Sequence, residues 1–269
     1  MDRRARTSPR RPPSVAPNTP DAVGMSGASA VGPIDTRPAA PYRRSNLIPM
    51  LKVDVHTHTR FFHAYEERPT RFDPIGARLL VALAKWRGLD AVVVTNHDYH
   101  TRFDFDIDGV TVVPGIEVST TEGHVLLIGS DPPERTAAGT LTPEETLDLA
   151  RDRGCAAVVA HPFRNSSVRE FDAPFDAYEV NGKRSVAIDR IRRLAEARGK
   201  PLVGGSDAHY PIEVGRAYTK VDADEATPGS IVDAIRDGRV EYELNETHSI
   251  RLLRRLYGYI HRHKDHIGG

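Results

Sequence analysis

Histidines and carboxylates that follow short apolar segments are the feature that most constrains this chain of 269 residues. Seven of its 12 histidines, with one glutamate and one aspartate, stand where β-strands are expected to end. They lie in Asp54-Val-His-Thr-His58, His63, Thr95-Asn-His-Asp98, Gly115-Ile-Glu117, His124, Ala160-His-Pro162 and Ser206-Asp-Ala-His209. Clustered divalent metals require imidazoles and carboxylates gathered from many points of a chain. We therefore expect a multinuclear metal site.

The pattern between these residues alternates short apolar runs with amphipathic stretches. Strands are expected at 51–55, 91–95, 110–118, 124–128, 156–160, 175–180, 202–204, 217–221 and 240–244. Helices are expected at 76–87, after the capping box at Thr142, at 185–198, at 227–236 and from about 249 to 263. This alternation predicts a largely parallel α/β architecture.

The position of the metal-binding residues favours a closed barrel over an open doubly wound sheet. Five of the expected strands carry such a residue at or just past the C-terminal end, which is the face where barrel enzymes place their chemistry. An open sheet would gather ligands at one switch point and would not converge so many.

Composition sets the domain boundaries and excludes several classes of protein. Residues 1–46 are rich in Pro and Arg and are expected to form a disordered tail, followed by a barrel at 47–245 and an amphipathic helix at 246–269 that packs on it. The 37 basic residues balance the 37 acidic ones, so stable nucleic-acid binding is not expected. No apolar run is long enough to span a membrane. A lone Cys155 excludes an internal disulfide and suits a reducing cytoplasm.

The spacing within the motifs suggests how the ligands are used. Side chains alternate along a strand, so His56 and His58 face the same side and can hold one cation together. Asp207 and His209 have the same spacing. Glu117 is the one carboxylate at a strand end in mid-chain, and a carboxylate can bridge two cations where an imidazole cannot.

These segments resemble the polymerase and histidinol phosphatase (PHP) family of metal-dependent phosphoesterases. The resemblance covers roughly residues 51–221 and has its motifs in the family's order: Asp-Val-His-Thr-His-Thr, Thr-Asn-His-Asp, Gly-Ile-Glu-Val-Ser, Ala-His-Pro and Ser-Asp-Ala-His. It implies a distorted seven-stranded (β/α)7 TIM-like barrel with up to three metals at the C-terminal ends of the strands.

The resemblance also implies a ligand set. A first metal would be held by His56, His58, Glu117 and Asp207, a second by Glu117, His124 and His161, and a third by His63, His97 and His209. Position 63 is often Asp in relatives, and His there favours zinc-like cations. Asn96 stands where many relatives carry Asp, which leaves the role of that position open.

The implied cofactors are two to three divalent ions (Zn²⁺, Mn²⁺ or Fe²⁺), and the implied activity is hydrolysis of a small phosphomonoester or short nucleotide by a hydroxide that bridges two metals. We expect Glu117 and Asp207 to be essential and Arg164 and Arg216 to contact phosphate, because guanidinium groups match phosphate oxygens. Two alternatives remain: an exonuclease that acts on nucleic-acid ends, and a regulatory metal-binding module without turnover. The oligomeric state is left open.

Overall fold

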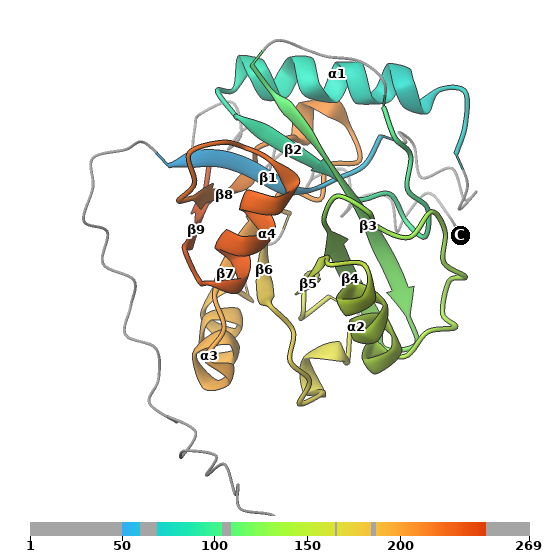
Figure 1. The fold of residues 1–269 in the computed structure, drawn as a ribbon. Helices are drawn as coiled ribbons and strands as arrows, with labels where there is room; N and C mark the ends of the chain where they lie inside the picture. Colours follow the sequence, from blue (N-terminus) through green and yellow to red (C-terminus); the bar gives the residue numbers. More distant parts are fainter. Residues whose placement is uncertain (1–49, 60–68, 104–108, 165, 184–186, 246–269) are drawn as a thin grey trace, which may run out of the picture. The chain divides into compact units, whose positions relative to one another are not determined.

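The computed structural model describes residues 50–59, 69–103, 109–164, 166–183 and 187–245 (Figure 1). All of them belong to one compact unit of the chain. The predicted N-terminal tail, the predicted C-terminal helix and His63 lie outside the described residues.

Within these described ranges, nine strands form one mixed sheet in the order β7-β6-β5-β4-β3-β2-β1-β8-β9. They are β1 (Leu51–Thr57), β2 (Ala91–Val94), β3 (Thr111–Thr120), β4 (Gly123–Ile128), β5 (Ala156–Val159), β6 (Ala177–Asn181), β7 (Leu202–Gly205), β8 (Ala217–Val221) and β9 (Val240–Leu244). The pairs β1–β2, β2–β3, β5–β6 and β6–β7 are parallel. The pairs β3–β4, β4–β5, β1–β8 and β8–β9 are antiparallel.

The predicted α/β class and a barrel-like sheet are confirmed, but the described residues form nine strands of mixed direction where a largely parallel sheet of seven was expected. The turn at Thr121 and Glu122 joins β3 to β4, and so short a connection can only return the chain antiparallel. The antiparallel β8–β9 pair adds two more strands beyond β1. A mixed sheet of nine strands results.

The sheet curls until it nearly closes, which brings β7 into contact with β8. Thr219 Oγ1 accepts a hydrogen bond from Gly204 N at 2.9 Å and donates one to Gly204 O at 3.0 Å. The strands approach so closely that a Cβ at Gly204 would lie 2.4 Å from the carbonyl oxygen of Tyr218. Glycine is therefore required at this contact.

Helices cover the outside of the sheet (Figure 1). They are α1 (Asp73–Trp86), α2 (Pro143–Asp152), α3 (Ile188–Arg198) and α4 (Pro228–Arg236), with short 3₁₀ turns η1 (Val168–Glu170) and η3 (Pro211–Glu213). The capping box before α2 is confirmed, since Thr142 Oγ1 accepts from Glu145 N and Glu145 Oε2 accepts from Thr142 N. Gly199 ends α3 with a left-handed φ of 60°.

Buried apolar side chains fill the space on both faces of the strands. Valines of β1 and β2 pack with α4, while residues of β3 to β6 pack with α2 and α3. This packing holds the strand ends in fixed positions and so determines where the polar residues that follow them can lie. Within the part of the chain that the structure describes, no helix has the length and apolar character needed to cross a membrane.

Candidate metal centre

Eight of the nine predicted metal-binding residues converge on one centre, and the ninth, His63, lies outside the described residues. β1 carries His56 and leads to His58, β3 carries Glu117, and β4 carries His124. His97, His161 and the pair Asp207 and His209 come from the segments that follow β2, β5 and β7. Their ligand atoms form four overlapping groups, within each of which the atoms lie no more than 4.8 Å apart.

Sharp turns direct several of these side chains into the centre. Asp98, His161 and Asp207 adopt positive φ angles of 56°, 27° and 51°, which side chains with a Cβ seldom adopt. Each lies two to four residues past the end of a strand (β2, β5 or β7), so the strained backbone lies at the rim of the centre.

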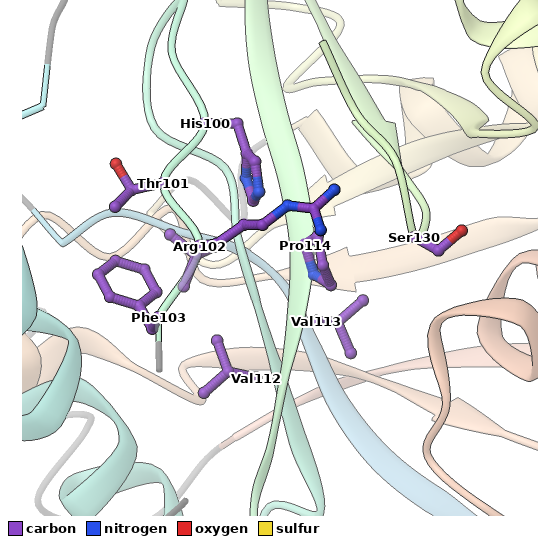
Figure 2. A pocket seen from close by; sticks show the side chains of 9 residues that line it. His100, Thr101, Arg102, Phe103, Val112, Val113, Pro114 and Ser130 are labelled. Atoms are coloured by element: carbon purple, nitrogen blue, oxygen red, sulfur yellow. The ribbon is translucent and has the colours of Figure 1, made fainter. Parts of the chain in front are cut away.

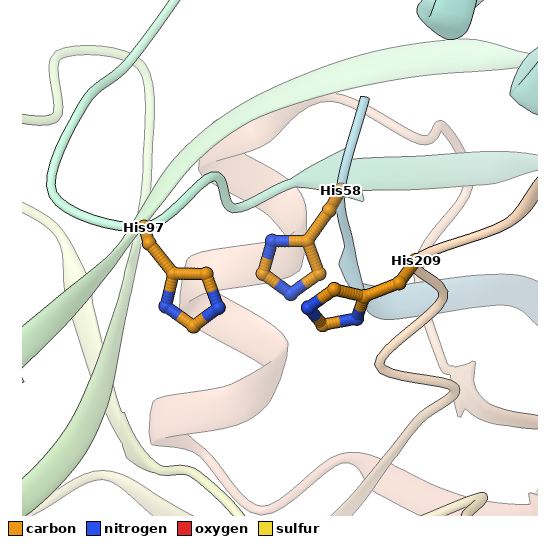
Figure 3. Close-up of side chains that lie close together, drawn as sticks. All are labelled: His58, His97 and His209. Carbon is orange, nitrogen blue, oxygen red and sulfur yellow. The ribbon is translucent and has the colours of Figure 1, made fainter. Parts of the chain in front are cut away.

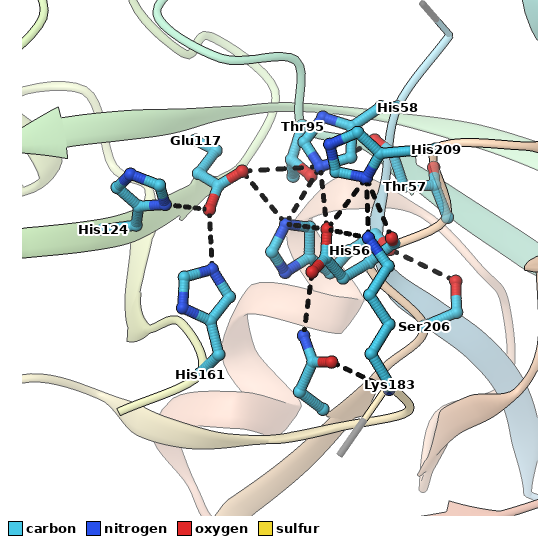
Figure 4. Close-up of polar contacts among 12 residues, drawn as sticks. His56, Thr57, His58, Thr95, Glu117, His124, His161, Lys183, Ser206 and His209 are labelled. Atoms are coloured by element: carbon cyan, nitrogen blue, oxygen red, sulfur yellow. Dashed lines mark hydrogen bonds and ion pairs between the residues drawn. The ribbon is translucent and has the colours of Figure 1, made fainter. Parts of the chain in front are cut away.

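Glu117 stands between two sets of imidazoles (Figure 4). Its Oε1 lies 2.7 Å from His124 Nδ1 and 3.1 Å from His161 Nε2. Its Oε2 lies 3.1 Å from His56 Nε2, 3.2 Å from His97 Nδ1 and 3.4 Å from His58 Nε2. The two oxygens of one buried carboxylate thus face different histidines, which is the arrangement that a bridging ligand needs.

Asp207 joins the centre to two basic side chains. Its Oδ1 lies 3.4 Å from His58 Nε2, 3.1 Å from His209 Nδ1 and 3.2 Å from Lys183 Nζ. Its Oδ2 accepts a hydrogen bond of 2.6 Å from Arg164 Nη1. Two positively charged groups, those of Lys183 and Arg164, therefore lie on one side of the centre.

Three histidines lie with their rings close together (Figure 3). The ring centroid of His58 is 4.7 Å from that of His97 and 4.2 Å from that of His209. His58 Nε2 also lies 3.2 Å from His56 Nε2. Ring nitrogens that point at one another repel when both carry lone pairs and when both carry protons, whereas a shared cation would satisfy them.

The electrostatics of the centre favour ionised carboxylates and divide the imidazoles. Burial lowers the pKa of His58 and His97, whereas at His56 and His124 the neighbouring carboxylates, Glu117 among them, outweigh burial and raise the pKa. Burial alone would raise the pKa of Glu117, but His97, His56 and His124 hold it well below its usual range. Burial would likewise raise the pKa of Asp207, but Lys183 outweighs it together with His56 and Arg164. The lowered pKa of His97 is about 4. Carboxylate anions and neutral imidazoles are the forms that bind metal ions.

Carboxylates of the surrounding layer hold the ligands in place. Asp54 accepts hydrogen bonds from Ser206 N at 2.9 Å and Gly215 N at 2.7 Å, which fixes the loop that carries Asp207. Asn96 bonds to Thr59, with its Oδ1 accepting from Thr59 N at 2.9 Å.

The sequence prediction missed Glu179 and Asn181 of β6. Glu179 Oε1 lies 2.9 Å from His56 Nδ1, and its Oε2 accepts a hydrogen bond of 2.7 Å from His161 N. Asn181 Nδ2 reaches both Glu179 and Asp207 at 3.3–3.4 Å. The available signal was a charged and an amide side chain two residues apart in a buried strand, because that spacing places both on one face.

The two predicted arginine contacts lie in different places. Arg164 reaches the centre through Asp207, and its side chain is 30% exposed. Arg216 is 1% exposed and forms an ion pair of 3.0 Å with Glu213, whose Oε2 accepts from His209 N at 2.9 Å. Arg216 is thus linked to the centre through Glu213, and direct contact with a substrate remains an untested prediction for both arginines.

The residues present fit a group of divalent cations. Six imidazoles and two carboxylates supply nitrogen and oxygen donors in overlapping sets of three, and most of them are buried. His58 Nδ1 and His161 Nδ1 are buried with no hydrogen-bond partner among the described residues. Glu117 belongs to two of the sets, as expected for a ligand shared between neighbouring metals.

A separate cavity of about 210 Å³ lies beside β2 and β3 (Figure 2). It is lined by Val94, His100, Thr101, Arg102, Phe103, Val112, Val113, Pro114 and Ser130, none of which belongs to the metal centre. His100 Nδ1 lies 3.2 Å from the carbonyl oxygen of Gly115, so this ring is held against β3.

Two uncharacterized proteins and one family model match parts of this sequence. It is 30% identical over 143 residues to the uncharacterized protein MJ1587 of Methanocaldococcus jannaschii, covering 48% of this chain and 81% of the relative. It is also 30% identical over 141 residues to the uncharacterized protein MJ0417 of the same organism, covering 47% of this chain and 56% of that one. The family model described as PHP-associated matches residues 187–240.

Solved structures share the fold at 20% identity. PsfC from Pseudomonas syringae superimposes with a TM-score of 0.63 over 78% of this chain and 98% of its own. A two-domain protein from Bacteroides vulgatus that contains a predicted PHP-like metal-dependent phosphoesterase gives 0.52 over 77% and 70%. The lesion-specific endonuclease PfuEndoQ from Pyrococcus furiosus gives 0.52 over 72% and 57%. The match of residues 187–240 to the PHP-associated model, together with 30% identity over 81% of MJ1587, shows that this chain belongs to the PHP family.

Proposed function

We propose that this chain is a metal-dependent phosphoesterase that hydrolyses a small phosphomonoester or a short nucleotide. The observation that carries the proposal is Glu117, whose two oxygens face separate sets of imidazoles beside the Asp207–Arg164–Lys183 group. This arrangement supports the proposal, because a carboxylate able to bridge two cations would lie next to groups that suit a phosphate.

The ligand groups suggest which residues would hold the metals. His56, His58 and Asp207 form one group, His124 and His161 meet at Glu117 Oε1, and His97 and His209 join through His58. When bound, divalent ions of this kind lower the pKa of a water molecule toward neutrality and offset the charge of a phosphoryl group.

The chain's own residues would bind and orient the substrate. The Arg164 guanidinium uses one nitrogen for Asp207 and has further N–H donors for a phosphoryl oxygen. Lys183 Nζ lies 2.8 Å from His209 Nδ1 and supplies a second positive charge on the same side. Asp207 would hold both basic groups in position, so that a phosphate enters beside the histidines.

A second candidate is cleavage of nucleic acid. The fold similarity to PfuEndoQ favours testing it, although the balanced charge of the chain does not provide the excess of basic residues that DNA binding generally uses. We infer that a small substrate is the better fit, and a DNA duplex with an abasic site belongs in the same assay.

The test is the variant Glu117→Gln, which keeps the shape of the side chain and removes its charge. We expect metal content measured by elemental analysis to fall, and turnover of p-nitrophenyl phosphate, a dinucleotide and histidinol phosphate to drop by at least about 100-fold. Glu144→Gln on the exposed face of α2 is the matched control and should change neither quantity.

Two results would overturn the proposal. One is a Glu117→Gln protein with full metal content and full activity. The other is wild-type protein that is loaded with metal but turns over none of the phosphate esters. Cleavage of the abasic duplex without turnover of the small esters would establish the second candidate instead.

A further inference from the structure

Helix α1 presents large apolar side chains to solvent. Phe72, just before the helix, is 60% exposed, Ile75 55%, Leu79 50% and Trp86 74%. The opposite face of α1 is buried, because Leu80, Val81 and Ala84 pack into the core beside β2. Soluble proteins seldom expose a continuous apolar stripe of this size unless it binds something. None of these residues belongs to the metal centre.

The stripe follows a seven-residue repeat. Phe72, Leu79 and Trp86 are each seven residues apart, and Ile75 and Ala82 fall between them at the alternating spacing of three and four. This is the spacing with which one helix packs against another through knobs and holes. The apolar residues therefore form a seam that matches a second helix.

A row of basic residues runs along one side of the seam. Arg71, Arg78 and Lys85 also repeat every seven residues, each directly before a large apolar residue of the seam. The one acidic residue of the helix, Asp73, is buried and its carboxylate accepts a hydrogen bond from Thr70 N. Within residues 71–86, all of which the structure describes, the exposed face of α1 thus combines an apolar seam with positive charge and no negative charge.

The basic row helps to distinguish the possible binding partners of this seam, which are a second copy of the chain, the chain's own ends, a membrane surface and another protein. A second copy of α1 packed antiparallel would bring the two basic rows together, which opposes association. The chain's own ends are also basic: residues 1–50 carry eight Arg against three Asp, and residues 246–269 carry five basic against two acidic residues. A membrane-surface helix would need no seven-residue register, so the repeat favours a helical partner.

We propose that the exposed face of α1, defined as Phe72, Ile75, Leu79, Ala82 and Trp86 with the basic row, binds an acidic amphipathic helix of another polypeptide. The partner would present apolar residues at a heptad spacing and glutamate or aspartate beside them. This proposal is independent of the phosphoesterase activity.

Trp86 is the chain's one tryptophan, so its fluorescence reports directly on this surface. The probe is a synthetic peptide of about three heptads with Leu at the core positions and Glu at the flanking ones. We expect a saturable blue shift of Trp86 emission as the peptide covers the ring, and no shift with the same peptide carrying Lys in place of Glu.

Two variants of the full chain test the seam and the charge separately. Leu79→Gln should weaken binding of the acidic peptide by at least about tenfold, because Leu79 lies at the centre of the seam. Reversing the basic row with Arg71→Glu, Arg78→Glu and Lys85→Glu together should transfer binding from the acidic to the basic peptide. Arg193→Glu on the exposed face of α3 is the matched control and should bind as wild type. Circular dichroism checks that each variant is folded.

Each alternative has its own signature. A blue shift with vesicles of anionic lipid, with none for the acidic peptide, would replace the proposal by membrane binding. Dimers in sedimentation that Leu79→Gln dissociates would replace it by self-association. Equal binding of both peptides, or no response to either, would overturn it.

Discussion

Glu179 shows how one side chain can serve two ligands at once. One of its oxygens lies against His56 Nδ1 and the other accepts from the backbone of His161. A hydrogen bond at Nδ1 leaves Nε2 of His56 free to face Glu117 and fixes the orientation of the ring. Glu179 is therefore expected to position two ligands that come from different strands.

Replacing this carboxylate should weaken metal binding without dismantling the centre. We expect Glu179→Gln to lower metal affinity by about 10- to 100-fold, because the amide offers one acceptor where the carboxylate offers two. A competition titration against a chelator measures the affinity, and Glu196→Gln on the exposed face of α3 is the control. An unchanged titration would show that Glu179 does not position these histidines.

For single residues, the sequence shows which side chains can bind metal, but it does not show which other residues position those side chains. The eight described donors stand out because histidines after apolar runs are unusual, and the resemblance to a family assigned their roles. From the sequence, Glu179 looks like an ordinary strand residue, because its role depends on which parts of the chain lie next to β6. Arg216 follows the last motif and was expected to contact phosphate, but only the fold shows that it pairs with Glu213.

Among the elements, the contact between β7 and β8 nearly closes the sheet through the hydroxyl of Thr219. This hydroxyl satisfies both the N–H and the carbonyl of Gly204, and all three groups are buried. Thr219→Val has nearly the same shape but leaves the two backbone groups unpaired, so we expect it to lower the free energy of unfolding by about 1–3 kcal/mol. Urea denaturation measures the change. Thr219→Ser keeps the hydroxyl and should lose less, and equal losses for the two variants would contradict this role.

Local signals predicted the elements better than the way they pair. The capping box of α2 and the Gly199 end of α3 depend on a few adjacent residues, so they are legible in the sequence. All nine strands also fall on segments that the apolar pattern marks. Their pairing depends on contacts between distant parts of the chain. The alternation of strands and helices favoured a largely parallel sheet, and the number of seven strands came from the resemblance. The antiparallel pairs β3–β4 and β8–β9 account for the difference.

At the scale of the whole molecule, the reactivity of Cys155, the chain's one thiol, reports whether the packing that buries it is intact. It is 1% exposed, and burial raises its pKa from an ordinary 9.0 to about 11. The neutral thiol therefore favours the folded state below pH 9, and this contribution is lost as the pH rises toward 11. At pH 8 we expect iodoacetamide to label the folded protein far more slowly than the urea-unfolded protein, as read by mass spectrometry. Equal labelling rates would show that Cys155 is accessible in the folded state.

The left-handed backbone at Asp98, His161 and Asp207 has a consequence for how this protein can change. Each such conformation costs about 1–3 kcal/mol for a residue with a side chain, and glycine would relieve it. Relief at His161 or Asp207 would also delete a donor atom. Selection for thermal stability alone would therefore favour glycine at these positions, whereas selection for the metal centre would oppose it at His161 and Asp207.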